Sequence, residues 1–153
     1  MKNARVLIGF LILVFGAAYF GSRFQPGEWY SLLKRPPFTP PSWLFAPVWT
    51  VLYAMIAVSG WKAWVSSRGT VRIAPFACWS FQLLLNAIWS FLFFGLHRLD
   101  LALAGAVLLW ASIILTICCF WRVHRVASLL LLPYLLWVSF ACLLTFSFWS
   151  LNR

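Results

Sequence analysis

The sequence predicts an all-α integral membrane protein: a bundle of five transmembrane helices with a structured, Pro- and Trp-rich loop between the first two. Of its 153 residues, 64% are hydrophobic and 9% are charged, whereas a soluble domain carries about a quarter charged residues. The charges leave five long uncharged intervals, residues 6–22, 36–61, 73–97, 101–121 and 126–152. A span needs roughly 20 apolar residues, and this length fits a single domain, residues 1–153.

These intervals place the five helices near residues 5–23, 43–65, 74–95, 100–121 and 127–150. The first interval has only 17 residues, and its basic start followed by small residues at 16–18 also resembles a signal peptide. Apolar residues continue through Tyr19 and Phe20, beyond the point where cleavage would fall. We therefore predict a retained first helix, with the signal peptide as the alternative.

The segment between the first two helices is the most unusual part of the chain. Residues 29–53 contain five Trp or Tyr residues and five prolines. Such a loop is costly in lipid unless it lies at an interface and is held in place. We expect Phe24–Ser42 to form a cap over one mouth of the bundle. Ser42 is the expected N-cap of the second helix, with Pro47 in its early turns.

The other connections are short, at Ser66–Ile73, His97–Asp100 and Arg122–Val126. Short loops predict that consecutive helices are antiparallel neighbours in an up-down bundle. Pro133 is expected to kink the last helix or to mark its first turn. No internal repeat is evident, which argues against an inverted-repeat transporter.

The net charge of +10 comes from cations scattered over every loop, which indicates membrane topology rather than nucleic-acid binding. The side of the N-terminus carries seven: Lys2, Arg5, Lys62, Arg68, Arg72, Arg122 and Arg125. The opposite side carries five: Arg23, Lys34, Arg35, Arg98 and Arg153. This bias favours a cytoplasmic N-terminus, an extracytoplasmic Trp29–Pro41 loop and a cytoplasmic membrane, with an outer membrane as the alternative.

Few residues are suited to acid/base catalysis. Glu28 and Asp100 are the only carboxylates, and both fall at predicted ends or loops, which argues against proton relays and carboxylate catalysis. His97 and His124 flank cations at helix ends. We expect solvated histidines at the interface, with axial haem ligation as the alternative.

The four cysteines also indicate no metal site. They lack CxxC spacing and lie within predicted helices, at Cys78, Cys118, Cys119 and Cys142. Buried free thiols that pack as small hydrophobic side chains are the expected state. We predict no disulfide framework and no bound cofactor.

A polar stripe runs along the third helix. Gln82, Asn86 and Ser90 recur every four residues, so they share one face, and such a face should lie toward the bundle interior. Trp89 and Phe93 neighbour this face. Hydrogen bonding between helices would explain the stripe without any ligand.

Two other helices carry aromatic faces. Trp49 and Tyr53 lie one turn apart on the second helix. The fifth helix carries the set Tyr134, Trp137, Phe140 and Ala141. Three such faces beneath an aromatic loop predict a mostly apolar pocket with a few orienting polar groups, suited to a flat hydrophobic ligand.

These residues match a known pattern, because the chain resembles the TspO/MBR family, the tryptophan-rich sensory proteins related to the mitochondrial translocator protein, or peripheral-type benzodiazepine receptor. Three blocks in family order carry the resemblance: Trp29-Tyr30 through Lys34 and the prolines to Trp43, Pro47-Val48-Trp49 and Leu52-Tyr53; Asn86, Trp89-Ser90 and Phe93-Phe94; and Pro133-Tyr134, Trp137 and Phe140-Ala141.

The resemblance implies a membrane receptor for porphyrins such as protoporphyrin IX and haem-like tetrapyrroles, and in relatives for cholesterol and synthetic isoquinoline or benzodiazepine ligands. The residues that match the family pocket are Tyr30, Trp49, Asn86, Trp89 and Trp137, with Ala141 at its wall. The expected partners are therefore a porphyrin-like ligand and the lipid bilayer. A homodimer is a further expectation, although the small-residue pairs Ala17/Gly21 and Ala102/Ala106 also suit packing within one bundle.

The resemblance also implies two other functions. Family members are associated with light-dependent breakdown of protoporphyrin, which would make Trp49 and Trp137 candidate catalytic residues, and a porphyrin transporter is another alternative. The family's sterol motif needs a Tyr, but Leu144–Arg153 offers Phe146 instead. We therefore do not expect cholesterol to be a natural ligand.

Overall fold

The computed structural model describes residues 2–67, 69 and 73–153. Arg68 and Arg72 of the connection Ser66–Ile73, which contribute to the charge bias, lie outside the described residues. The elements are α1 (Lys2–Ser22), α2 (Glu28–Leu32), α3 (Ser42–Ser66), α4 (Ile73–Ser90), the π-helical segment η2 (Phe91–Gly95), α5 (Leu99–Trp121), α6 (Arg125–Leu129) and α7 (Leu132–Leu151).

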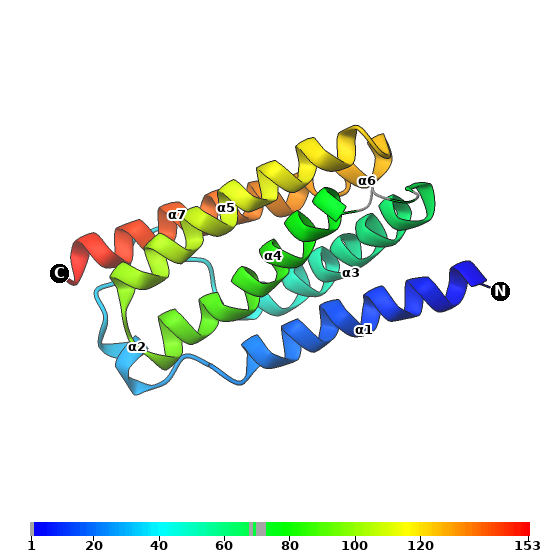
Figure 1. Ribbon diagram of the computed structural model, residues 1–153. Coiled ribbons are helices and arrows are strands. Elements are labelled where there is room, and N and C mark those ends of the chain that lie inside the picture. The colour runs from blue at the N-terminus through cyan, green and yellow to red at the C-terminus, as the bar shows by residue number, and fades with distance from the viewer. Residues whose placement is uncertain (1, 68, 70–72) are drawn as a thin grey trace.

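The predicted fold class is confirmed, because five helical stretches of the described residues are long and apolar enough to cross a membrane. They are Asn3–Ser22, Ser42–Ser66, Ile73–Gly95, Leu99–Trp121 and Arg125–Leu151. Each predicted boundary lies within two residues of the observed one. The two termini lie at opposite ends of the bundle, and α2 lies at the same end as the C-terminus (Figure 1).

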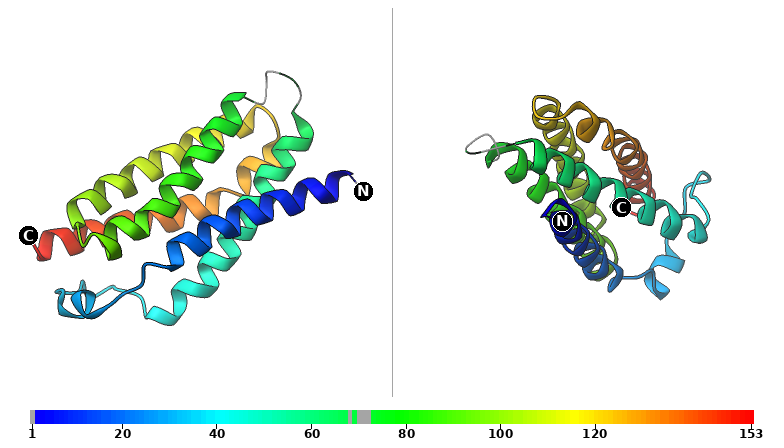
Figure 2. Two further views of the ribbon diagram at one scale, coloured as in Figure 1. Left: turned by 60° about the horizontal axis from the view of Figure 1, so that its bottom comes forward. Right: turned by 90° about the vertical axis from the view of Figure 1, so that its right-hand side faces the viewer.

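The helices do not all pack in chain order. The close pairs are α4 with α5, α5 with α7, and α1 with both α3 and α4 (Figure 2). The backbones of α3 and α4 approach less closely, and this consecutive pair is in contact through large side chains, as in the Trp64–Phe76 ring contact at 4.9 Å. The large Trp79 side chain lies between them, and its Nε1 donates to the Ile56 carbonyl over 3.3 Å. This wide spacing leaves room for large side chains at the bundle centre.

The start of α3 differs from the prediction. Pro41, not Ser42, is the N-cap residue, and no side chain caps the helix. The proline ring fixes φ near its observed value of −62°, so Pro41 with ψ at 143° supplies the extended residue before the first turn. Pro47 lies within the helix near its start, as predicted.

The fifth span begins with a short separate helix. A turn after α6 leads into α7, and Pro133 lies in the first turn of α7, one of the two predicted outcomes. His124 is not simply solvated: it is half-buried, and its Nδ1 accepts a hydrogen bond from the Ala127 backbone N–H over 3.2 Å. His124 therefore caps α6.

Small residues on α1 and α5 allow helices of the bundle to pack closely. Gly21 is buried on α1 where it meets α4, since a Cβ there would lie 3.5 Å from Ser90 Oγ, and Ala102 and Ala106 are also buried. Gly21 and the alanine pair therefore pack within one bundle.

The cysteines are free as predicted, but the expectation that all are buried is wrong. Cys118 is exposed on the outer face of α5, and the other three are half-buried.

Candidate ligand site

Asn86 lies at the centre of the candidate site and connects three helices. Tyr53 Oη on α3 donates to Asn86 Oδ1 over 2.8 Å, and Asn86 Nδ2 donates to Tyr134 Oη on α7 over 3.0 Å. Asn86 is 5% exposed and Tyr134 is fully buried. The row satisfies both ends of the Asn86 amide in an apolar interior, where an unpaired amide would be costly.

Trp49 covers one side of this hydrogen-bonded row. Its ring stacks on Tyr53 with centroids 5.2 Å apart and an interplanar angle of 29°. The same indole meets Tyr134 edge-on, with centroids 6.2 Å apart. Trp49 and Tyr53 are four residues apart on α3, so their rings lie on one helical face. This confirms the aromatic face expected on the second span.

Trp137 and Phe140 on α7 extend the aromatic surface. Their ring centroids are 5.7 Å apart. Phe45, at the start of α3, meets Trp137 edge-on at 5.8 Å, and Phe38 of the loop meets Phe140 at 6.4 Å. Phe38 and Phe45 are not among the residues predicted for the pocket, although both lie in the segment rich in prolines and aromatic residues.

A second group of aromatic residues lies below the loop. Tyr30 of α2 contacts Phe93 and Phe148, with ring centroids 6.2 Å and 5.5 Å away. Trp89 packs on Phe93 at 5.2 Å, and its Nε1 donates to the Ala102 carbonyl on α5 over 3.1 Å. Phe140 packs with this group while it also contacts Trp137, so the two aromatic groups adjoin.

The polar stripe of α4 is only partly directed toward this site. Gln82 and Asn86 are buried, but Ser90 is half-buried against Gly21 of α1. Gln82 Nε2 donates to the Trp79 carbonyl over 2.9 Å, and Gln82 Oε1 has no hydrogen-bond partner among the described residues. Ala141, one turn after Trp137, is half-buried. Asn86 is thus the stripe residue that joins the aromatic faces.

The π-helical segment η2 places Phe93 and Phe94 below the loop. The Leu96 N–H donates to the Phe91 carbonyl five residues earlier over 2.8 Å. This wider helical turn lets Phe93 become buried while Phe94 meets Tyr30 edge-on at 5.6 Å. π-helical turns occur often at functional sites, and the apolar sequence here gave no sign of one.

The loop is held down at the C-terminal end of α7. Asn152 Oδ1 accepts from the Lys34 N–H over 2.9 Å, and Asn152 Nδ2 donates to the Lys34 carbonyl over 3.1 Å. The Arg35 guanidinium lies over the Tyr30 ring, 4.9 Å from its centroid. Burial raises the pKa of Tyr30 and the Arg35 charge opposes this rise, so the Tyr30 hydroxyl stays protonated at neutral pH. The expected structured cap is confirmed.

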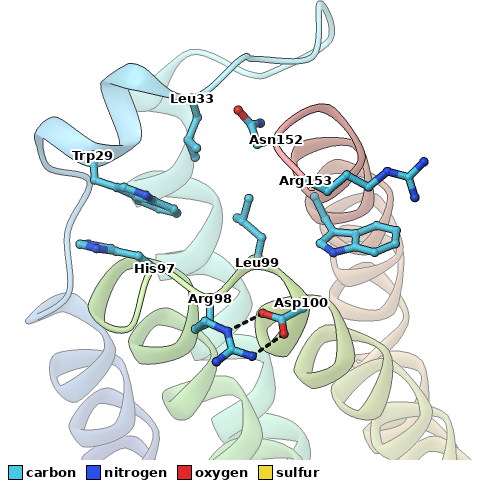
Figure 3. A pocket seen from close by; sticks show the side chains of 9 residues that line it. Trp29, Leu33, His97, Arg98, Leu99, Asp100, Asn152 and Arg153 are labelled. Atoms are coloured by element: carbon cyan, nitrogen blue, oxygen red, sulfur yellow. Dashed lines mark hydrogen bonds and ion pairs between the residues drawn. The ribbon is translucent and has the colours of Figure 1, made fainter.

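An open pocket lies beside this contact, at the mouth of the bundle. In Figure 3 the Trp29 and His97 rings lie flat against each other, with centroids 4.4 Å apart and an interplanar angle of 15°. His97 is exposed and has a φ of 56°, an uncommon conformation for a residue with a side chain. Arg98 donates twice to the Asp100 carboxylate, over 2.8 Å and 2.6 Å. The pocket has a mixed polar and apolar lining, and Trp29 joins it to the second aromatic group through its contact with Phe93 at 6.1 Å.

The family model described as TspO/MBR matches residues 9–150 of the chain. The chain belongs to the TspO/MBR family. It is 42% identical over 147 residues to the tryptophan-rich protein TspO of Chlorobaculum tepidum, covering 92% of this chain and 91% of that one. It is 38% identical over 133 residues to protein CrtK of Rhodobacter capsulatus, with 86% and 83% covered. Its identity to the bovine translocator protein is 32% over 151 residues, with 95% and 89% covered.

Membership of the TspO/MBR family agrees with the five-span fold and makes this chain a multi-pass integral membrane protein. The matched range includes every residue proposed for the pocket, from Tyr30 to Ala141. It also includes the loop and the π-helical turn. Asn152, which holds the loop, lies just beyond the matched range.

In this TspO/MBR protein, the change Asn152→Ala is expected to loosen the loop. It removes two hydrogen bonds to Lys34, each worth about 1 kcal/mol, so the loop should open roughly thirtyfold more often. Trypsin should then cleave the Lys34–Arg35 bond several-fold faster in the detergent-solubilised protein. Ser147→Ala is the matched control, since its hydroxyl bonds only to the Leu143 carbonyl of its own helix. Equal cleavage rates in both variants would show that Asn152 does not hold the loop.

Proposed function

We propose that this protein is a membrane receptor that binds tetrapyrroles such as protoporphyrin IX, and other flat hydrophobic ligands, between α3, α4 and α7. The observation that carries the proposal is the row Tyr53–Asn86–Tyr134, with the Trp49 indole against it and Trp137 one helical turn after Tyr134 on α7. Indole and phenol rings stack on a flat ring system, and the central amide orients it. Membership of the TspO/MBR family supports a sensory role, because a relative that is 31% identical is named a tryptophan-rich sensory protein.

The charge at the mouth of the bundle also favours this ligand class. Lys34 and Arg35 lie in the loop, and Arg153 ends the chain beside Asn152. Protoporphyrin carries two carboxylates on one edge. When the flat face of the porphyrin stacks on the indoles, its carboxylate edge would lie toward these cations. The cations attract the carboxylates and so favour a single orientation of the porphyrin.

Binding requires the aromatic side chains to separate. Trp49 contacts Tyr53 and Tyr134 directly, so the ligand gains ring contacts only where existing contacts give way. The loop between α1 and α3 is the element positioned to open. Its attachment consists of side-chain contacts, namely two hydrogen bonds from Asn152 and ring contacts such as that of Tyr30 with Phe148, and these can break without unfolding a membrane-spanning helix. Ligand exchange would therefore follow the opening of this loop.

Titration of the purified protein with protoporphyrin IX, in detergent and in the dark, tests the proposal. The expected result is a saturable shift of the porphyrin absorption band together with quenching of tryptophan fluorescence. Empty detergent micelles provide the baseline. A linear signal that matches partitioning into these micelles would contradict the proposal.

Light-dependent breakdown of porphyrin is the second candidate function. Its support is the placement of electron-rich rings, because Trp49 stacks on Tyr53. An indole that gives an electron to an excited porphyrin would have a phenol next to it that can replace this electron. Illuminating the same titration separates the candidates. If porphyrin is lost in light only when the protein is present, the result supports an enzyme. If bound porphyrin is stable in light, the result supports a receptor or carrier. Flux in proteoliposomes tests transport.

A further inference from the structure

Two cysteines from neighbouring helices meet at the end of the bundle that carries the N-terminus. Cys78 on α4 and Cys119 on α5 have their Sγ atoms 4.0 Å apart, within range of a weak hydrogen bond between thiols. Both are half-buried, whereas Cys118 next to them is exposed on the outer face of α5. The two helices run side by side along this stretch (Figure 1).

The relative position of the two helices is fixed here by a ring contact. Phe76, two residues before Cys78, packs on Phe120, directly after Cys119, with ring centroids 5.9 Å apart. A disulfide needs an S–S distance of about 2.05 Å. The remaining approach is about 2 Å, which rotation of the cysteine side chains about their Cα–Cβ bonds can supply. The pair is therefore positioned for bond formation within the native bundle.

The pair also lies close to the aqueous phase. Cys119 precedes the exposed Arg122 by three residues, about 5 Å along a helix. Cys78 follows the start of α4 at Ile73 by five residues, about 8 Å. A small polar oxidant thus reaches the thiols without crossing the hydrocarbon core.

We propose that Cys78 and Cys119 form a redox-active dithiol site, which a peroxide oxidises to a disulfide joining α4 to α5. One thiolate attacks the peroxide O–O bond, which forms a sulfenic acid and releases water from hydrogen peroxide. The second thiolate attacks the sulfenic sulfur, the S–S bond forms, and hydroxide leaves as water. Two thiols are oxidised and one peroxide is reduced, and a dithiol reductant reverses the change. The proposal does not depend on which ligand the protein binds.

Mass spectrometry of the digested protein tests this directly. The full chain in detergent is treated with hydrogen peroxide, its remaining thiols are blocked, and the peptides are analysed without reduction. The expected result is one peptide pair joined through Cys78 and Cys119, with two of the four thiols lost and restored by dithiothreitol. Four intact thiols, or sulfinic acid on single cysteines without a joined pair, would overturn the proposal.

The other two cysteines provide matched controls. The double variant Cys118→Ser/Cys142→Ser keeps the pair, so both remaining thiols should be lost on oxidation. Cys78→Ser and Cys119→Ser each leave three thiols, and neither should form an intramolecular bond. Oxidation that instead yields cross-linked dimers through Cys118 would show that exposure, not the paired geometry, determines the reaction.

Discussion

Replacing Asn86 by leucine is expected to lower protoporphyrin affinity tenfold or more and to destabilise the bundle. The change removes the partner of two hydroxyls, those of the half-buried Tyr53 and the fully buried Tyr134. Hydrogen bonds between membrane helices are individually modest, and an unpaired buried hydroxyl adds its own cost. We expect a loss of about 1–3 kcal/mol in unfolding free energy, measured by thermal unfolding in detergent.

Gln82→Leu is the matched control for this variant. Gln82 is buried one turn earlier on the same helix, but it bonds only to the Trp79 carbonyl and its Oε1 has no partner among the described residues. Gln82→Leu should therefore change the porphyrin affinity and the unfolding free energy less than Asn86→Leu does. Equal effects of the two variants would show that Asn86 has no special role and that any polar group on this face serves equally.

The double change Trp49→Phe/Trp137→Phe is expected to weaken porphyrin binding by roughly tenfold to a hundredfold. Stacking of each indole contributes about 0.5–1.5 kcal/mol beyond the area that it buries, and a phenyl ring retains only part of this. The measurement is the dark titration of the porphyrin absorption band. If the unmodified protein degrades porphyrin in light, this double variant should not, because it lacks the two indoles that are the proposed electron donors.

Two exposed tryptophans supply the control for this pair. Trp43 and Trp121 are 70% and 50% exposed and lie away from the Asn86 row. Trp43→Phe/Trp121→Phe changes the same number of indoles and should leave the affinity unchanged. If both double variants bind porphyrin as the unmodified protein does, the aromatic site is not where the ligand binds.

The sequence determines the spans closely because a charge inside the hydrocarbon core is costly. The uncharged intervals therefore mark the helices, and even the short first interval becomes α1, whose Phe10 and Val14 are buried in the core. Asn86 could also be placed from its spacing, since an amide in the middle of a span needs partners inside the bundle. Its partners Tyr53 and Tyr134 were predicted as aromatic faces, not as hydrogen-bonding groups.

Other features depend on contacts that spacing cannot show. The Lys34–Asn152 pair joins residues 118 positions apart, and nothing local in either segment marks it. The π-helical turn at Phe91–Gly95 arises from a hydrogen-bond pattern in a run of apolar residues. Ser90 shares the stripe with Asn86, yet it lies against Gly21 because α1 packs beside α4. Helix packing determines these outcomes, and helix periodicity does not reveal it.

The most direct measurement for the binding site is an experimental structure of the protein with protoporphyrin IX bound. The expected result is a porphyrin between Trp49 and Trp137, with Asn86 at its inner edge and its carboxylates toward Lys34 and Arg35. A porphyrin in the open pocket beside Trp29 and His97, or in the groove that Phe20 of α1 and Leu83 of α4 line, would contradict the proposed site.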